Sequence, residues 1–206
     1  GQVIEGSSFQ RAVEGEPIGV FFMPKYLGVD PATGDALYQG QDDKPTTNYN
    51  AAKRMVVGDP NPDFTGGFSN TFSYKGIDLN VFFTFVQGNE IYNNAGRFMS
   101  SGFGGGLDNQ TKEILRRWKN PGDITDIPRV SLSFPTGHRT SSRWIYDGSY
   151  IRLRQLSIGY NLPESVVQSL KISAARLYVS GTNLWTKTDY ISDPEVNTLG
   201  TGVTGV

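Results

Sequence analysis

The chain has 206 residues, a formal net charge of -1 and no cysteine. This charge gives no reason to expect a nucleic-acid partner, and the lack of cysteine excludes a disulfide framework or a thiolate metal site. Aromatic residues make up 12% and charged residues 19% of the chain, with 25 glycines, which suits many strands and turns. Mean hydropathy is -0.37 and no run approaches the ~18 apolar residues of a membrane helix, but a transmembrane barrel would show no such run.

The N-terminal third contains one predicted strand and a long polar connection. The first residues, GQVIEGSSFQ, lack a basic segment followed by an apolar core, so no signal peptide is visible and, for an exported protein, the sequence is expected to be a fragment. A strand is predicted over 18–26, where Pro24 indicates a bulge or departure from the sheet. A breaker-rich loop is predicted over 28–63. Within it, residues 30–35 resemble part of a calcium loop in composition, but the spacing favours a turn capped by side chains.

Strict alternation over residues 64–86 predicts a hairpin with a tight turn at 75–78. Each arm is about ten residues long, which a tilted strand needs to cross a bilayer. One face is mainly aromatic and aliphatic and the other mainly hydroxyl, glycine and amide, although Phe82 and Val86 fall on the polar side. This pattern is typical of a barrel wall between lipid and a wet lumen. A long hairpin in a soluble β-sandwich alternates in the same way and remains an alternative.

A second long loop is predicted over 87–142. Its glycine cluster at 102–106 is interpreted as loop, because no Lys-Ser or Lys-Thr follows as a phosphate-binding loop requires. One short helix is predicted over 108–118, capped by Asp108. His138 is the only histidine. Without a second histidine or a cysteine, it is predicted to be a solvated loop residue.

Two further strands are predicted over 143–160 and 174–185. In the first, the apolar alternation slips by one residue near Arg154, and a β-bulge there would keep the apolar residues on one side and both arginines, Arg152 and Arg154, on the other. An arginine facing lipid at the midplane costs roughly 2–4 kcal/mol, so both are expected to face the lumen. A short helix over 164–170 is predicted to separate these strands. The connections alternate between short (75–78 and 161–172) and long (28–63, 87–142 and from 187 onward), as in outer-membrane barrels.

Four blocks of sequence carry a family resemblance. They are VGDPNPDF at 57–64 with FSYKG at 72–76, WKNPGDITDIPR at 118–129, DGSYIRL at 147–153 with GYNLP at 159–163, and YVSGTNLWT at 178–186 with DPEV at 193–196. In order and spacing, over about residues 14–196, the chain resembles the C-terminal barrel of the SusC/RagA-type TonB-linked (TonB-dependent) outer-membrane receptors.

The resemblance implies an all-β fold, an antiparallel transmembrane β-barrel segment that is part of a 22-stranded barrel with long extracellular loops. Residues 1–206 would be the C-terminal portion of that barrel, without the plug domain, the TonB box or the last strand, with 198–206 in an outer loop. The implied function is active import of oligosaccharides, or in some members peptides, across the Gram-negative outer membrane. It would use a SusD-like lipoprotein and energy from the TonB complex, and no cofactor. A soluble carbohydrate-binding β-sandwich and a passive porin are the alternatives.

Candidate site residues follow from position and chemistry. Trp118, Trp144 and Tyr190 are candidates for stacking on sugar rings; alternatively, Trp144 and Tyr190 belong to an interfacial aromatic belt and Trp118 packs its loop. Arg152, Arg154 and Arg176 are expected to line the lumen, where they would steer an anionic or hydroxyl-rich solute; alternatively, they pair with plug carboxylates and are structural. No nucleophile and base stand in a convincing context, so no enzyme and no metal site are predicted. Two sets of residues define the expected faces: Phe68, Phe72, Phe83 and Leu177 toward lipid, and Ser69, Thr71, Arg152 and Arg176 inward.

Overall fold

The computed structural model describes residues 1–102, 109–133 and 136–195, and these form two compact units. We call residues 62–89 and 147–194 the sheet unit, and residues 1–61, 90–146 and Glu195 the loop unit. The predicted glycine loop from 103 onward, the proposed cap Asp108 and the tail 198–206 lie outside the described residues. In the described part of the chain, no helix is both long and apolar enough to cross a membrane.

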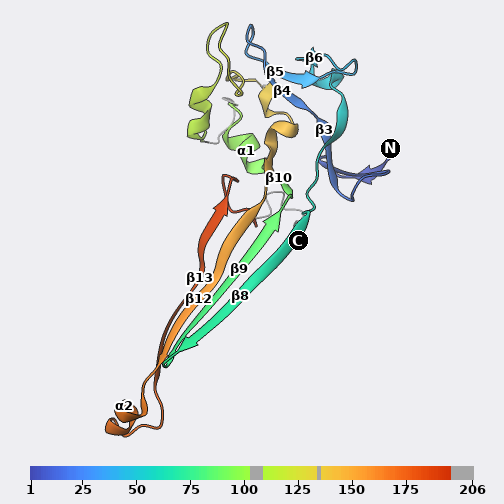
Figure 1. The fold of residues 1–206 in the computed structure, drawn as a ribbon. Helices are drawn as coiled ribbons and strands as arrows, with labels where there is room; N and C mark the ends of the chain where they lie inside the picture. The colour runs from blue at the N-terminus through green and yellow to red at the C-terminus, as the bar shows by residue number, and fades with distance from the viewer. Residues whose placement is uncertain (103–108, 134–135, 196–206) are drawn as a thin grey trace. The chain divides into compact units, whose positions relative to one another are not determined.

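The sheet unit is a four-stranded antiparallel sheet in the order β13-β12-β9-β8 (Figure 1). Its strands are β8 (Phe64–Tyr74), β9 (Ile77–Gln87), β12 (Tyr150–Asn161) and β13 (Arg176–Thr188). The predicted short helix is α2 (Glu164–Ser169), which connects β12 to β13 and follows Pro163 at its N-cap. At 11 to 13 residues, each strand is long enough for a tilted crossing of a bilayer.

The hairpin turn is tighter than predicted. Tyr74 pairs with Ile77, which leaves only Lys75 and Gly76 in the turn, with φ of 46° and 83°. Positive φ at both positions identifies the type I′ turn that matches the twist of antiparallel strands. Ile77 and Asp78, predicted as turn residues, therefore belong to β9.

The predicted bulge in β12 is confirmed. The pairing of β12 with both neighbours shifts between Leu153 and Gln155, and Leu153 pairs with Phe83 while Gln155 pairs with Phe82. Arg154 is the extra residue on β12. Because of this insertion, Leu153 and Leu156 lie on the same face although an uninterrupted strand would separate them.

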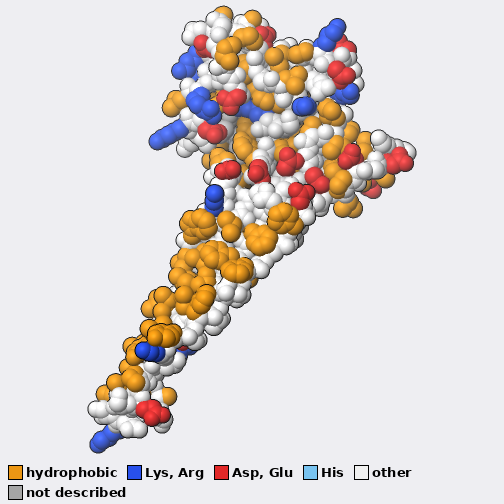
Figure 2. Space-filling view, in the orientation of Figure 1, with side chains coloured by type: hydrophobic (Ala, Val, Ile, Leu, Met, Phe, Trp, Pro, Cys, Tyr) orange, Lys and Arg blue, Asp and Glu red, His pale blue; other side chains and the backbone are white. Residues whose placement is uncertain are grey.

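The registers divide the sheet into two faces of different chemistry. We call apolar face the side that carries Phe64, Phe68, Phe72, Phe83, Phe85, Ile151, Leu153, Leu156, Ile158, Leu177, Val179 and Trp185. The polar face carries Ser69, Thr71, Asn80, Thr84, Arg152, Ser157, Arg176 and Thr186. The two sets of residues predicted to share a face are confirmed by this pairing, as is the position of Phe82 and Val86 on the polar side. Figure 2 shows hydrophobic side chains gathered along the length of this sheet.

A glycine on β12 lets an ion pair cross the polar face near the Lys75-Gly76 turn. Arg176 of β13 pairs with Asp78 of β9, two strands away, and Gly159 lies between them. A Cβ at Gly159 would stand 2.5 Å from the Arg176 guanidinium and 2.7 Å from the Asp78 carboxylate. The missing side chain therefore makes room for a contact that joins β13 to β9 across β12.

The loop unit contains three small sheets. One consists of β1 (Val3–Gly6), β2 (Gln10–Val13), β3 (Val20–Pro24) and β7 (Arg54–Gly58); the second of β4 (Tyr26–Val29), β5 (Ala36–Gln39) and β6 (Pro45–Thr46); and the third of β10 (Glu90–Tyr92) and β11 (Ile145–Asp147). Its helices are α1 (Asn94–Met99) and the 3-10 turns η1 (Tyr49–Ala51), η2 (Lys112–Arg116), η3 (Thr136–His138) and η4 (Ser142–Trp144).

Several predicted elements of the loop unit are corrected by the structure. The expected departure of a strand at Pro24 is confirmed, since β3 and β4 belong to different sheets. The predicted loop 28–63 instead contains strands, which are only two to five residues long and in which apolar and polar residue types do not alternate regularly. The predicted helix over 108–118 is described only as the 3-10 turn η2, and the predicted strand 143–160 is divided into η4, β11 and β12.

The core of the loop unit combines aromatic rings with a half-buried cation, Arg143. Phe21, Met23, Tyr92 and Trp144 form one buried cluster. The Arg143 guanidinium lies 4.4 Å from the Trp144 ring and donates to the carbonyl oxygens of Gly137 and Ser100 at 2.7 and 3.1 Å. Partial burial lowers the pKa of Arg143 from its usual value, while the two carbonyl oxygens and the Trp144 ring compensate its guanidinium for the lost contact with water.

His138 is buried in the loop unit, so the prediction of a solvated loop residue was wrong. Its side chain is 6% exposed, and its Nδ1 lies 2.8 Å from the Arg97 carbonyl oxygen and 3.1 Å from Ser101 Oγ. Since a carbonyl only accepts, Nδ1 carries the proton. Burial and the nearby Arg97 charge lower the pKa of His138.

The lowered pKa predicts that acid weakens this part of the loop unit. The folded state disfavours protonation of His138, so its stabilising contribution is complete above the unfolded pKa of ~6.5 and declines as pH falls below it. Hydrogen-exchange protection of residues 97–101 in the full-length receptor should be lower at pH 5 than at pH 7.5 after correction for intrinsic rates. The His138→Gln variant should show a smaller difference, and equal protection of the wild type at both pH values would contradict the prediction.

The polar-face crossing predicts a cost for any side chain at position 159. Gly159→Val would push Arg176 and Asp78 apart, and overpacking of this kind costs about 1–3 kcal/mol. The expected result is a lower temperature for the conversion of folded to unfolded receptor on a heat-modifiability gel. Ser157→Val, two positions away on the same face, is the matched control and should shift the transition less. Equal transitions would show that the crossing adds no stability.

Candidate functional site

The polar face of the sheet carries all three arginines predicted to line a lumen. Arg152 is 5% exposed, forms an ion pair with Asp193 and lies with its guanidinium 5.5 Å from the Tyr150 ring. Asp193 belongs to the connection that follows β13, so this pair attaches that connection to the sheet. A buried guanidinium needs such a counter-charge, because an uncompensated one is strongly destabilising.

The bulge directs Arg154 across three strands. Its Nε donates to Thr84 Oγ1 on β9 and its Nη1 to Asn183 Oδ1 on β13, both at 3.2 Å. Asn183 has φ of 52°, a left-handed conformation that asparagine tolerates better than most residues. One side chain thus links both neighbours of β12 where the ladder is interrupted.

Arg176 lies at the other end of the polar face. It pairs with Asp78 over Gly159, and its guanidinium lies 5.7 Å from the Tyr178 ring. Arg152 and Arg176 are separated by roughly 25 Å at 3.3 Å per residue. The three arginines therefore share a face but do not form one cluster, and each has a partner within the sheet unit.

The structure does not bring the aromatic candidates together in one binding surface. Trp118, in the loop unit, is half-buried, donates from Nε1 to the Pro31 carbonyl at 3.0 Å and packs so closely on Gly34 that a Cβ there would lie 2.4 Å from its ring. Trp144 is 1% exposed, with Nε1 donating to the Arg139 carbonyl at 3.2 Å. Tyr190, in the sheet unit, is 5% exposed. These contacts favour packing roles, and sugar stacking by these residues stays a prediction.

The turn that packs against Trp118 is held by its own side chains. Asp30 accepts hydrogen bonds from the Ala32 amide and the Thr33 hydroxyl, both at 2.9 Å, and these bonds lower the pKa of its carboxyl. The preferred interpretation of residues 30–35 as a capped turn is confirmed. Among the described residues, no three acidic or histidine side chains form a group that could hold a metal ion.

Sequence reasoning missed the partners that position the arginines. Asp78 was assigned to the turn, although a two-residue turn would have placed it in the β9 alternation, on the same face as Asn80 and Thr84. Asp193 occurs within the DPEV block, but nothing local connects it with Arg152, which lies 41 residues earlier.

Comparison with known proteins now identifies the family. No protein-family model matches the chain. The TonB-dependent receptors P3 and P26 of Formosa agariphila are 40% and 33% identical to it, over 89% and 95% of the chain. These matches cover 19% and 21% of the two relatives, so the chain spans about a fifth of the length of the curated relatives it matches.

Solved structures give the same result. The structure of the RagAB peptide importer in the 'open-open' state matches 93% of the chain with a TM-score of 0.79 and 30% identity. The 'closed-closed' state matches 91% with a TM-score of 0.75 and 29% identity. Each match covers 21% of the solved chain. The chain belongs to the SusC/RagA-type TonB-dependent receptors, a family of Gram-negative outer-membrane proteins.

Proposed function

We propose that the sheet unit is four adjacent strands in the wall of an active outer-membrane importer, within the C-terminal portion of a 22-stranded barrel. The apolar face would contact lipid and the polar face would line the lumen. The observation that carries this proposal is the separation of the two faces over the whole length of β8, β9, β12 and β13. A barrel of this size requires many further strands, which would pair with the outer edges of β8 and β13.

The exposed apolar face argues against the soluble β-sandwich. A sandwich covers such a face with a second sheet about 10 Å away. Here Phe68, Leu177 and Val179 are 60%, 67% and 77% exposed in the described structure. Exposed to water, each would lose much of the ~1.5–3 kcal/mol that burial of a large apolar side chain provides. Lipid supplies that burial without a second sheet.

The connections orient the proposed wall. The type I′ turn at Lys75-Gly76 and the α2 connection join strands at one end of the sheet. The 62 residues between Gln87 and Tyr150 connect β9 to β12 at the opposite end. Because outer-membrane barrels have short periplasmic turns and long extracellular loops, the α2 end is periplasmic and the other end extracellular.

The polar face suits a passage for hydrophilic solutes. It presents hydroxyls and amides, while Arg152 and Arg176 are neutralised by Asp193 and Asp78. Such a wall offers hydrogen bonds but no strong electrostatic field of one sign. A strong field of one sign would hold a solute of the opposite charge in place. A polar oligomer is therefore the class of cargo that this face supports.

The relatives support a proposal for the partner, the energy source and the cargo. We infer a RagB- or SusD-like surface lipoprotein as partner, because the matched structures are those of the RagAB complex. Energy would come from TonB, as the names of the curated relatives imply. Likeness to a peptide importer favours a peptide as cargo. An oligosaccharide is the alternative, supported by the resemblance to SusC-type receptors.

A charge placed on either face tests the membrane orientation. Phe68→Arg would put a guanidinium into lipid at a cost of about 2–4 kcal/mol, whereas Ser69→Arg, one residue away, would put it into the lumen. The full-length Phe68→Arg receptor should show less folded protein in the outer-membrane fraction, measured by heat-modifiable mobility. Ser69→Arg should assemble at close to the wild-type level. The reverse order would invert the assignment of the faces, and extraction of the wild type without detergent would exclude the barrel.

Binding and uptake measurements test the transport proposal. The purified full-length receptor with its lipoprotein partner should bind short peptides saturably in calorimetric titrations, and titration with oligosaccharides tests the alternative. Uptake by whole cells should stop when the proton-motive force is collapsed. Uptake that continues under those conditions would identify a passive porin, and the absence of peptide binding would remove the peptide assignment.

A further inference from the structure

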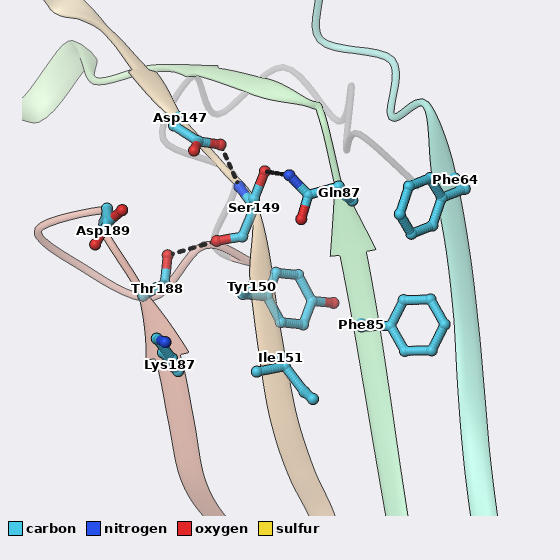
Figure 3. Close-up of a pocket in the computed structure, with 10 residues that line it drawn as sticks. All are labelled: Phe64, Phe85, Gln87, Asp147, Ser149, Tyr150, Ile151, Lys187, Thr188 and Asp189. Carbon is cyan, nitrogen blue, oxygen red and sulfur yellow. Dashed lines mark hydrogen bonds between the residues drawn. The ribbon is translucent and has the colours of Figure 1, made fainter.

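The chain turns back on itself directly after β13. Thr188, the last residue of this strand, donates from Oγ1 to the Ser149 carbonyl at 2.9 Å and accepts from the Tyr190 amide at 3.1 Å. A hydroxyl that accepts from the amide two residues later is typical of a turn. Figure 3 shows the ribbon reversing its direction beyond Asp189. We call residues 189–194 the fold-back segment, and all of them belong to the sheet unit.

The fold-back segment lies over the polar face. Asp193 forms an ion pair with Arg152, which pairs in the sheet with Thr186, two residues before the end of β13. The segment therefore runs back along the strand by roughly 7 Å, at about 3.3 Å per residue. Because Arg152 is on the polar face, the segment lies on that face as well. Tyr190 and Pro194 are buried, so the segment packs on the protein near both of its ends.

Burial on the polar face is greatest at this end. Val86 and Phe82 are apolar side chains on the polar face of β9, and they are 5% and 37% exposed. Val86 pairs with Tyr150 at the first position of β12, whereas Phe82 pairs beyond the bulge. Over the described ranges, β9 is therefore covered on this face at the end where the fold-back segment lies, and it is accessible further along.

An ion pair joins the far end of the segment to the sheet. The Arg152 side chain is nearly fully buried, whereas the Asp193 side chain is 46% exposed. The guanidinium keeps its place without the segment, because β12 carries it and it lies 5.5 Å from the Tyr150 ring. Asp193 lies in a connection, where no ladder of backbone hydrogen bonds fixes it. Loss of the pair should therefore move the segment and not the strand.

The proposed function places this end of the sheet at the extracellular mouth of the passage. A layer of chain packed on a sheet takes up about 10 Å, the spacing of packed sheets. On the basis of that function, we propose that the fold-back segment narrows the mouth and that the ion pair of Arg152 with Asp193 holds it there. The segment limits the size of the solute that enters. When the pair is broken, the segment swings outward from Thr188 and larger solutes pass.

Motion of the segment in the full-length receptor tests the role of the ion pair. A spin label is attached at Ile191→Cys, an exposed position of the segment, in a receptor without other cysteines. Asp193→Asn should raise the ratio of mobile to immobile label about two- to fivefold, the change expected for loss of one partly exposed ion pair. Asp189→Asn is the matched control and should leave the ratio unchanged, since no ion pair among the described residues includes Asp189. An unchanged ratio in Asp193→Asn would overturn the proposal.

A second variant applies if Asp193→Asn does not assemble, because that change leaves a buried guanidinium without its counter-charge. Arg152→Met combined with Asp193→Asn removes both charges and keeps a long side chain at position 152. This double variant should assemble and release the segment to the same extent. A label that stays immobile in the folded double variant would overturn the proposal.

Entry of reagents of graded size tests the constriction itself. Gln155→Cys places a thiol on an exposed part of the polar face, on the order of 10 Å further along the sheet than Arg152. In intact cells, its reaction rate with a maleimide on a long polyethylene glycol chain is compared with that of a small charged thiosulfonate. The ratio of the two rates should rise about two- to fivefold in Asp193→Asn. An unchanged or lower ratio, with a mobile segment, would show that the segment does not limit entry.

The same thiol separates this proposal from the proposed function. If the polar face lines the passage, the small charged reagent reaches Gln155→Cys from outside the cell. Reaction with a lipid-soluble maleimide alone would place this face in the bilayer and overturn both proposals. Reaction with the small charged reagent at a constant size ratio would overturn the constriction and leave the barrel assignment standing. No reaction with either reagent would place the barrier elsewhere in the receptor and also overturn the constriction.

Discussion

The sheet depends on one extra residue in β12. Arg154 shifts the alternation by one position, so that Leu156 and Ile158 continue the apolar face begun by Ile151 and Leu153. Without the insertion, either the first pair of apolar residues or the second would share a face with the arginines. At the bulge, where the backbone pairing of β12 is interrupted, the Arg154 side chain contacts both β9 and β13. Its hydrogen bonds therefore connect the three strands at the interruption. Both chemical faces follow from this arrangement.

Neutralisation of cations on the polar face is the second organising feature. Arg152 and Arg176 are paired with carboxylates from distant parts of the sheet unit, and Gly159 gives one of these pairs its space. The arginines therefore hold strands and a connection together while they present polar chemistry. In a wall proposed to face a passage, the side chains proposed to line it would also hold neighbouring strands together. Structural and transport roles need not be assigned to different residues.

Sequence reasoning succeeded where a pattern was long. Eleven residues of strict alternation predicted β8, and a phase slip around Arg154 predicted the bulge. It failed where elements are short: β5 has four residues, in which burial alternates but residue type does not. It failed for His138 because burial there depends on Arg97 and Ser101, which lie 41 and 37 residues away. The sheet face on which each arginine lies could be predicted from the alternation. The residue that pairs with it could not, because that residue is distant in sequence and is brought close only by the tertiary fold.

The outer edges of the sheet affect how the polypeptide behaves before it is assembled in the membrane. In the described part of the chain, β8 and β13 pair on one side only, so each strand has a row of backbone donors and acceptors on its other side. Next to them lies the apolar face, with its exposed phenylalanines. Between synthesis and assembly, such an edge would form backbone hydrogen bonds with other extended strands, including the same strand of another copy of the chain. To reach the membrane without aggregating, this segment must therefore stay unfolded or bound to a chaperone until neighbouring strands are available.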